Sequence, residues 1–389
     1  MGSDLEPVQL AAVLAAVVLL ASVLSVELGL AVALFELGLG VLVGNVFDLH
    51  SQEWLDFIAT FASIVLTFLA GAEVDPDDFR ERFGSTMAIG LVSFIGPFVV
   101  ATLVAYGLLD WSVKASLIAG TTLSTTSLAV VYAVLVETGL NASRVGKLLM
   151  GACFVTDLGT ALALTAIFIT PNAWFPVFIV VSVGLMVLLP KIAPWFFRRY
   201  GDRVIEPEIK LVFLCLFVLM VLADASNGHA VLPAFILGLL MARHYQQHRQ
   251  EQVRLRVVAF AFLTPFFFIK GGLNVSLGAV FASIGTLAVL LAAKMVPKLG
   301  LVFPLARRAE PEHGAFITLL MSTGLTFGTI SSLYGLSAGI IDKTQFSLLV
   351  TVVVLSAIVP TAIAQKWFSP GHISDLEPSE KPLSWDEFV

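Results

Sequence analysis

Apolar stretches long enough to span a membrane alternate with short polar clusters along almost the whole chain, from Val8 to Phe368. About 20 apolar residues in a helix cross a bilayer core of ~30 Å, and a helix satisfies its own backbone polar groups there. The pattern therefore predicts an all-α polytopic membrane protein with about 13 transmembrane helices. The predicted spans are residues 8–26, 28–47, 53–72, 85–109, 114–136, 145–170, 173–195, 209–225, 230–243, 252–272, 277–305, 313–335 and 344–367.

The amino-acid composition agrees with this pattern and excludes a soluble domain. Hydrophobic residues make up 58% of the 389 residues and charged residues only 13%, roughly half the charged fraction of soluble domains. Cys153 and Cys215 lie inside apolar spans, so no disulfide framework is expected. The sequence has no basic patch with interleaved aromatic residues, so we expect no nucleic-acid partner. The expected partner is the lipid bilayer, with no soluble partner and no cofactor.

The 22 Lys and Arg residues predict how the chain crosses the membrane. With the N-terminus outside, seventeen fall in cytoplasmic loops or the C-terminal segment, and only Lys114 and Lys343 fall in outer loops. Because such an excess marks the cytoplasmic side, we predict a prokaryotic inner-membrane protein with a cytoplasmic C-terminus. The first span lacks a basic flank and a cleavage site, so we expect a retained helix. The polar, acidic residues 369–389 are predicted to form a disordered cytoplasmic tail.

Two segments in the first half of the chain resemble two segments in the second half. Residues 68–75 (FLAGAEVD) resemble residues 268–275 (FIKGGLNV), and residues 121–127 (TTLSTTS) resemble residues 322–329 (STGLTFGT). The partners in each pair are seven predicted helices apart, and this odd offset gives them opposite directions across the membrane. The sequence therefore predicts an inverted-topology repeat, which is typical of secondary transporters.

The second pair of segments is rich in Ser, Thr and Gly, which favour local breaks in a helix at bilayer depth. Matching breaks in the two halves of a transporter indicate its ion site. Close helix packing through small residues is the alternative, and the matched positions favour breaks over it. We therefore predict two broken helices. The residues expected at the breaks are Ser124, Thr125 and Thr126 in one helix, and Thr323, Gly324 and Thr326 in the other.

Asp157 lies near the middle of the predicted span 145–170, where a charged group is costly and usually functional. Because a medium of low dielectric disfavours the bare carboxylate, we expect this group to hold either a proton or a monovalent cation. Two ligands that exclude each other at one site are the minimal chemistry of exchange. The alternative is a carboxylate that pairs with a lysine to hold the helices together.

Four of the other charged residues within predicted spans or at their ends are considered beside Asp157. Lys294 is in mid-span and is predicted to balance Asp157 when no cation is bound. Lys298 is nearer the end of the same span, and we expect it to extend its ammonium group to the membrane interface. Glu73 fits a place beside the ion path and a solvated helix end equally well, and the role of Lys270 is equally open.

Together these segments resemble the monovalent cation/proton antiporter superfamily, on its Kef/NapA-like branch, over nearly the whole chain. Residues 68–75 resemble its F-x-x-G-x-E-x-D signature, and residues 233–238 (PAFILG) resemble its G-A-F-x-x-G motif with Pro for the first Gly. Residues 265–272 (PFFFIKGG) resemble its F-F-x-x-x-G segment. Thr156 and Asp157 resemble a pair that reads Asp-Asp, Asn-Asp or Gln-Asp in relatives.

The resemblance implies the NapA/NhaA-like antiporter fold, in which the two broken helices cross near Asp157, and a homodimer in which the ion-transport domain of each subunit moves as an elevator. The implied domains are residues 1–83 and 209–276 for dimerisation, residues 84–171 and 277–368 for ion transport, and residues 172–208 as a linker helix. Asp157 would be the essential carrier of the cation and the proton. Hydroxyl and backbone oxygens at Ser124, Thr125 and Thr126 would complete the cation shell. Lys294 matches the family's conserved basic residue and, with Glu73, would supply supporting charge.

Thr156 departs from the pattern of electrogenic relatives, which have Asp at this position. Thr cannot ionise, so Asp157 remains as one titratable carboxylate, and Thr156 is expected to offer a hydroxyl ligand instead. We therefore predict exchange of one cation for one proton without net charge movement. Na+ is the expected cation, and the residues do not separate it from K+ or Li+.

Two other transport classes and an enzyme are the alternatives. A sodium-coupled symporter of the related bile-acid fold would need a cavity for an organic substrate. A cation channel would need a continuous polar pore instead of one buried carboxylate. We expect no enzyme, because the sequence has no zinc-site histidine pair on a helix and no nucleophile elbow.

Overall fold

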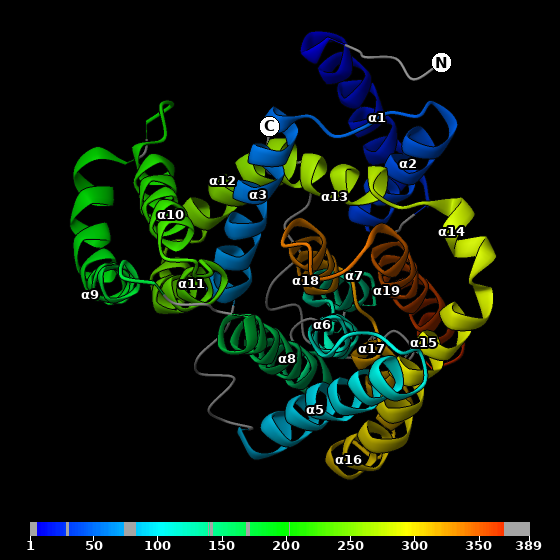
Figure 1. Cartoon of the computed structure of the whole chain (residues 1–389). Coiled ribbons are helices and arrows are strands. Elements are labelled where there is room, and N and C mark those ends of the chain that lie inside the picture. The colour runs from blue at the N-terminus through cyan, green and yellow to red at the C-terminus, as the bar shows by residue number, and fades with distance from the viewer. Residues whose placement is uncertain are drawn as a thin grey trace.

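In the computed structural model, all secondary structure of the described residues is helical (Figure 1). The structure describes residues 6–28, 31–73, 83–138, 140, 143–168, 172–201 and 203–368. Within these ranges, ten helical segments are long and apolar enough to cross a membrane. The all-α polytopic prediction is therefore confirmed, while the total of thirteen spans stays a prediction. The tail predicted at residues 369–389 lies outside the described residues, as do Val74 and Asp75.

The helices form two sets that lie beside each other (Figure 1). The first set contains α1 (Pro7–Leu28), α2 (Val32–Val46), α3 (Glu53–Ala72), α9 (Phe175–Tyr200), α10 (Pro207–Ala225), α11 (Val231–Gln247), α12 (Arg249–Val258) and α13 (Thr264–Leu273). The second set contains α5 (Phe83–Gly107), α6 (Val113–Ser124), α7 (Leu128–Glu137), α8 (Arg144–Phe168), α14 (Leu277–Ala282), α15 (Ile284–Pro297), α16 (Phe303–Ala309), α17 (Gly314–Met321), α18 (Thr326–Ser337) and α19 (Lys343–Ile363). Three π-helical turns continue α12, α15 and α19: η1 (Ala259–Leu263), η2 (Lys298–Val302) and η3 (Ala364–Phe368).

Packing within each set is extensive. In the first set, α3 packs against α11 and α13, α2 packs against α13, and α9 lies outermost against α10 and α11. In the second set, α5 packs against α6, α8 and α15, and α18 packs against α6 and α19. The predicted linker helix, α9, therefore contacts helices of the first set. The roles assigned to the two domains stay a prediction.

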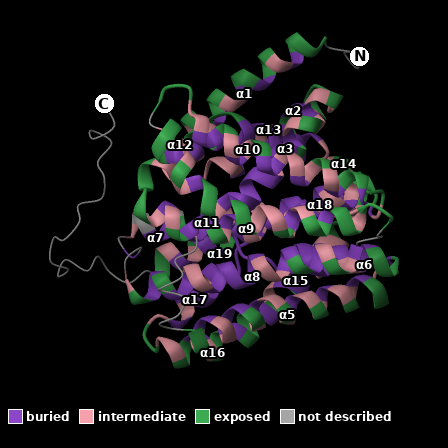
Figure 2. Cartoon of the chain, turned by 90° about the vertical axis from the view of Figure 1, so that its left-hand side faces the viewer, coloured by how far each residue is buried: buried purple, intermediate pink, exposed green. Residues whose placement is uncertain are grey.

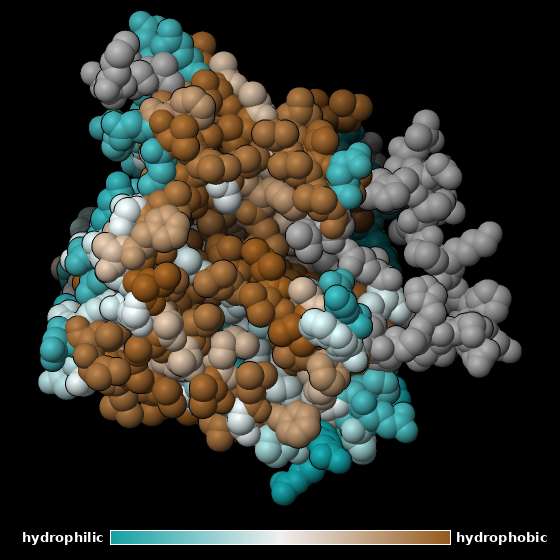
Figure 3. Space-filling view, turned by 90° about the vertical axis from the view of Figure 1, so that its right-hand side faces the viewer, coloured by the Kyte–Doolittle hydropathy of each residue, from teal (hydrophilic) through white to brown (hydrophobic). Residues whose placement is uncertain are grey.

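The two helices that were predicted to be broken are interrupted as expected, and they are the most buried of the candidate spans. The helical path stops at residues 125–127 between α6 and α7, and at residues 322–325 between α17 and α18. In the apolar 18-residue window of each span, 83% and 89% of the residues are buried, whereas the corresponding shares are 22% for α1 and 17% for α9 (Figure 2). Figure 3 shows a broad apolar surface on one side of the molecule, as contact with lipid tails requires.

Glycine allows helices of the first set to approach backbone to backbone. A Cβ on Gly71 of α3 would lie 2.1 Å from the carbonyl oxygen of Phe235 in α11, and a Cβ on Gly238 of α11 would lie 1.9 Å from that of Phe68. Only glycine fits at such reciprocal contacts, which small residues commonly form between membrane helices. The motif residues 233–238 thus serve the packing of α11 against α3.

The contact between α2 and α13 can be tested by a matched pair of substitutions. Gly40→Ala would bring a Cβ to 2.5 Å from the carbonyl oxygen of Ile269, whereas nothing lies within 4 Å of a Cβ on Gly38. We expect Gly40→Ala to lower the free energy of unfolding by roughly 1–3 kcal/mol because of overpacking. Gly38→Ala should leave it unchanged or raise it by up to ~1 kcal/mol, since Ala favours helix. Thermal unfolding in detergent measures both; equal effects would contradict the close approach.

Candidate ion-binding site

The two breaks lie against each other and are joined by the ammonium group of Lys298. Its Nζ donates to the carbonyl oxygen of Thr125 at 2.9 Å, to Oγ1 of Thr126 at 2.9 Å and to the carbonyl oxygen of Met321 at 2.8 Å. The Thr126 hydroxyl also donates to the Met321 carbonyl oxygen at 3.0 Å. A lysine ammonium has three donors, so this arrangement uses all of them on the two broken helices.

Helix dipoles explain why a cation belongs at this place. Thr125 directly follows the end of α6, and Met321 is the last residue of α17. The carbonyl ends of two half-helices therefore meet, and each carries partial negative charge. Lys298 is fully buried, where water cannot neutralise these ends, so its ammonium group does so. The prediction that Lys298 extends to the membrane interface is wrong, because its acceptors lie inside the protein.

Asp157 lies on α8, which packs against all four half-helices α6, α7, α17 and α18. Its side chain is 1% exposed, and its Oδ1 has no hydrogen-bond partner among the described residues. A buried carboxylate oxygen without a partner is costly. The oxygen therefore needs a proton, a cation or water.

A cavity of about 50 Å³ lies beside Asp157 at the seam between the two sets of helices. This volume exceeds the ~10–15 Å³ that one water needs, so the cavity has room for a small ion with part of its hydration shell. The cavity is lined from both sets, by Ala33, Leu66, Leu69, Ala70, Glu73, Phe260 and Phe268 on one side and by Thr126, Leu128, Ala129, Asp157, Thr326 and Phe327 on the other.

The amino ends of two half-helices reach the same cavity. Leu128 begins α7 and Thr326 begins α18, and both residues line the cavity with Asp157. The N-terminus of a helix carries partial positive charge and favours an anion. The carboxylate thus faces two such ends, while Lys298 binds the two opposite, carbonyl ends.

The structure brings some of the predicted site residues to this cavity and leaves others outside it. Thr126, Thr326 and Glu73 line it together with Asp157. Other predicted residues are buried but do not line it, and each of their hydroxyls donates to a backbone carbonyl oxygen of its own helix. These are Thr156 (to Cys153, 2.7 Å), Ser124 (to Thr121, 2.9 Å), Thr125 (to Thr122, 3.3 Å) and Thr323 (to Leu320, 2.8 Å).

Lys294 lies one helical turn before Lys298 and is also fully buried. A Cβ added to Gly324 would lie 2.2 Å from its Nζ, so the amine reaches the second break. Its Nζ has no hydrogen-bond partner among the described residues. Lys294 is therefore close to the crossing but does not hold it together, and its predicted balancing of Asp157 stays a prediction.

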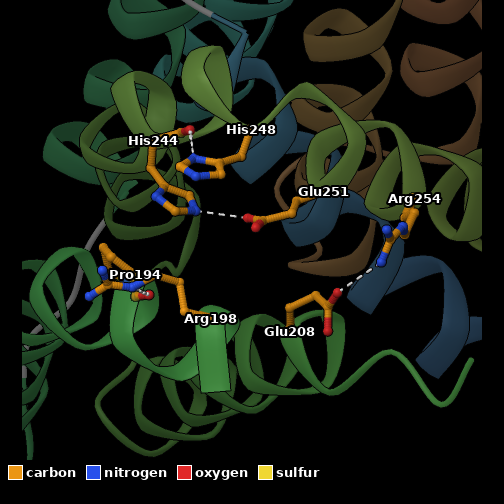
Figure 4. A network of polar contacts seen from close by, with 7 residues as sticks. All are labelled: Pro194, Arg198, Glu208, His244, His248, Glu251 and Arg254. Carbon is orange, nitrogen blue, oxygen red and sulfur yellow. Dashed lines mark hydrogen bonds and ion pairs between the residues drawn. The ribbon is translucent and has the colours of Figure 1, made fainter. Parts of the chain in front are cut away.

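Glu73 follows the last residue of α3 and pairs with Arg256 of α12, with 3.0 Å between Oε1 and Nη2. Helix α12 also makes polar contacts with the end of α11 and the start of α10 (Figure 4). In this network His244 Nε2 contacts Glu251 Oε2 at 2.7 Å, and Arg254 Nη1 contacts Glu208 Oε1 at 3.2 Å. Glu73 thus lines the cavity at a helix end where it is paired and mostly buried, and its role beside the ion path stays a prediction.

Sequence reasoning missed the roles of Lys298 and Arg256, and it did not single out Glu36. The i, i+4 spacing of Lys294 and Lys298 places both on one helix face, which could have drawn attention to Lys298. Arg256 gave no such signal, because its partner Glu73 is far away in the sequence. Glu36 of α2 is a further carboxylate that is 1% exposed, and its Oε2 has no hydrogen-bond partner among the described residues.

The fold is shared with a solved membrane transporter. The structure of the sodium proton antiporter MjNhaP1 from Methanocaldococcus jannaschii superimposes with a TM-score of 0.68 over 91% of this chain and 96% of that one, at 12% sequence identity. At this identity the likeness shows the fold alone. The chain therefore has the fold of a cation/proton antiporter, as predicted.

Sequence comparison defines the family. A family model described as "Sodium/hydrogen exchanger, transmembrane" matches residues 12–367, and the chain belongs to this family. Among curated relatives, "Na(+)/H(+) antiporter NhaS4" of Synechocystis is 25% identical over 84% of this chain and 85% of its own length. "Na(+)/H(+)-K(+) antiporter GerN" of Bacillus cereus is 23% identical over 87% of this chain and 90% of its own length.

Two other relatives are matched over less of their length. "Probable Na(+)/H(+) antiporter 3" of Methanocaldococcus jannaschii is 24% identical over 62% of this chain and 65% of its own length. A Bacillus subtilis relative is 22% identical over 91% of this chain, which spans 61% of that protein. The chain thus covers somewhat less than two thirds of these two relatives.

The different roles of the two buried lysines can be tested through stability. Lys298→Met removes the donor to the Thr125 and Met321 carbonyl oxygens, and we expect it to lower the free energy of unfolding by roughly 2–5 kcal/mol. Lys294→Met removes an amine without a hydrogen bond, so it should leave stability unchanged or increase it. Thermal unfolding of both variants in the same detergent is the measurement. A Lys294→Met variant as unstable as Lys298→Met would argue against this division.

Proposed function

We propose that this protein exchanges a monovalent cation, Na+ in the first place, for H+ across a membrane. The observation that carries the proposal is the buried Asp157 carboxylate, which lines a cavity large enough for a small ion and whose Oδ1 has no hydrogen-bond partner among the described residues. Membership of the sodium/hydrogen exchanger family supports it. The printed names of the relatives include Na+/H+ and Na+/H+-K+ antiporters, so K+ remains a second candidate cation.

Exchange follows from competition at one carboxylate. A buried carboxylate without a partner is unstable, so the group takes up either a proton or a cation before it moves across the membrane. Binding of one ligand releases the other, which couples the two fluxes. Lys298 donates to backbone and hydroxyl oxygens, and this leaves the carboxylate free to serve the transported ions.

Oxygen atoms near Asp157 supply further cation ligands in this proposal. The hydroxyls of Thr126 and Thr326 lie at the cavity wall, and hard cations prefer oxygen ligands. Thr156, Ser124 and Thr125 donate their hydroxyl hydrogens to backbone. None of these three residues lines the cavity, so their oxygens would reach the ion only after a local rearrangement.

Alternating access is proposed to move the second set of helices against the first, within a homodimer. The cavity lies at the seam between the sets, and close glycine contacts hold the first set together. Following the excess of Lys and Arg in one group of loops, we place the N-terminus outside and the C-terminus in the cytoplasm of a prokaryotic cell.

The size of the cavity favours an ion over an organic substrate. Sites for drug-sized ligands are typically about 300–1,000 Å³, whereas the cavity beside Asp157 is about 50 Å³. The symporter alternative would need a larger cavity at this carboxylate. Transport of an ion, and no enzymatic reaction, is therefore the proposed activity.

Replacing the carboxylate tests the proposal directly. We expect Asp157→Asn to reduce Na+-driven proton efflux from proteoliposomes at least about 100-fold, because the amide neither ionises nor neutralises a cation. Proton flux is measured with a trapped pH-sensitive dye. The control is Glu27→Gln, the corresponding change at an exposed position of α1, which should keep wild-type flux. Full flux in a well-folded Asp157→Asn variant would refute the assignment.

Stoichiometry can be tested independently of the site. Because Thr156 leaves one ionisable group in the pair, we expect one Na+ to exchange for one H+. Exchange should then be insensitive to an imposed membrane potential and should generate no current on a supported membrane. A potential-dependent rate or a Na+-induced current in wild-type proteoliposomes would show that more than one proton moves per cation.

A further inference from the structure

A second and larger cavity lies along the same seam. Its volume is about 380 Å³, and its walls come from α3, from α13, from α18 and from the α10–α11 connection. The residues that the argument uses are Thr60, Ile64, Asp224, Phe267, Lys270 and Ile330. Thr60 and Asp224 are exposed at its mouth.

Both cavities are formed by the same three helices. Helices α3, α13 and α18 each line the cavity beside Asp157 and this larger one. At the inner end of the larger cavity, Ile64, Phe267 and Ile330 are buried. Phe268, next to Phe267, and Phe327, one turn before Ile330, line the Asp157 cavity. A thin apolar barrier therefore separates the two.

The larger cavity contains an ion pair at its wall. Nζ of Lys270 lies 2.9 Å from Oδ1 of Asp56, and the lysine side chain is 10% exposed whereas the aspartate is 50% exposed. Lys270 lines the cavity, and Asp224 adds a carboxylate at the mouth. His229 has an Nε2 without a hydrogen-bond partner among the described residues and packs edge-on against Tyr334, with 4.4 Å between ring centroids.

We infer that the larger cavity is the outer vestibule through which the cation approaches Asp157, and that the Asp56–Lys270 pair sets how readily cations enter it. This inference rests on the proposed function and orientation. The α3 N-terminus, the α10–α11 connection and the α18 C-terminus meet at the cavity, and all three fall on the outer side in that orientation. The Asp157 cavity, which Glu73 borders at the opposite end of α3, lies toward the other side.

The Asp56–Lys270 pair acts on cation entry through the charges that it places beside the path. The ammonium group of Lys270 faces the path and repels a cation, and the Asp56 carboxylate cancels most of this repulsion. Removing either partner leaves one uncompensated charge, which a low-dielectric wall screens less than bulk water does. The two single substitutions must then change cation access in opposite directions. If the ion pair served only stability, replacing either partner would lower the stability of the protein, and the two substitutions would not shift cation access in opposite directions.

The test measures the Na+ concentration that half-saturates exchange, separately on the outer and the inner face of the protein. In the proteoliposomes, transporters inserted in one of the two orientations are selectively inactivated, so that only the other orientation is measured. On the outer face at low ionic strength, we expect Lys270→Gln to lower half-saturating Na+ about three- to tenfold and Asp56→Asn to raise it by a similar factor. The double variant should return close to wild type. The inner face should not change, and impermeant salt should reduce both shifts.

Two control variants and one alternative test variant make the outcome decisive. Lys270→Arg keeps the charge and should keep the wild-type value, and Lys343→Gln changes an exposed lysine outside the cavity lining and should have no effect. If the pair variants do not fold, Asp224→Asn should still raise outer half-saturating Na+. Shifts in the same direction, equal shifts on both faces, or no shift would overturn the inference. Wild-type protein without Na+-driven proton flux would instead overturn the proposed function.

Discussion

The packing of the two broken helices in the second set depends on one buried ammonium group, that of Lys298. Two helices stop in mid-membrane, and each exposes carbonyl oxygens that neither lipid nor water can satisfy. Lys298 donates to Thr125, Thr126 and Met321 at once, so a single side chain satisfies both breaks. The breaks in turn place the amino ends of α7 and α18 at the wall of the Asp157 cavity.

The separate contacts of Lys298 and Asp157 support the proposal that one carboxylate carries both ions. If Lys298 paired with Asp157, the cation would have to compete with an ammonium group at short range. The three donors of Lys298 are instead used by the broken helices, and Asp157 Oδ1 has no hydrogen-bond partner among the described residues. The seam beside it is formed by two differently built surfaces. One belongs to helices joined by glycine contacts, and the other contains both breaks.

The sequence was sufficient to predict the elements that carry a local signal. Uninterrupted apolar stretches predicted the helices, Ser, Thr and Gly in matched tracts predicted both breaks, and a lone carboxylate in mid-span predicted the burial of Asp157. Contacts between distant segments were not predictable in this way. The partners of Lys298 lie 173 and 23 residues away, and spacing within one helix does not show toward which neighbour a side chain turns. The same limit hid Arg256, whereas Glu36 carries the same local signal as Asp157, a lone carboxylate in mid-span.

The acceptors of Lys298 also impose an order on biosynthesis. Thr125 is made long before Lys298, but Met321 follows it by 23 residues. When the segment that contains α15 and η2 leaves the ribosome, its two lysines therefore have only part of their surroundings in place. A helix with two uncompensated lysines inserts poorly on its own. We expect this segment to enter the bilayer against helices that are already there and that supply Thr125 and Thr126, instead of inserting on its own.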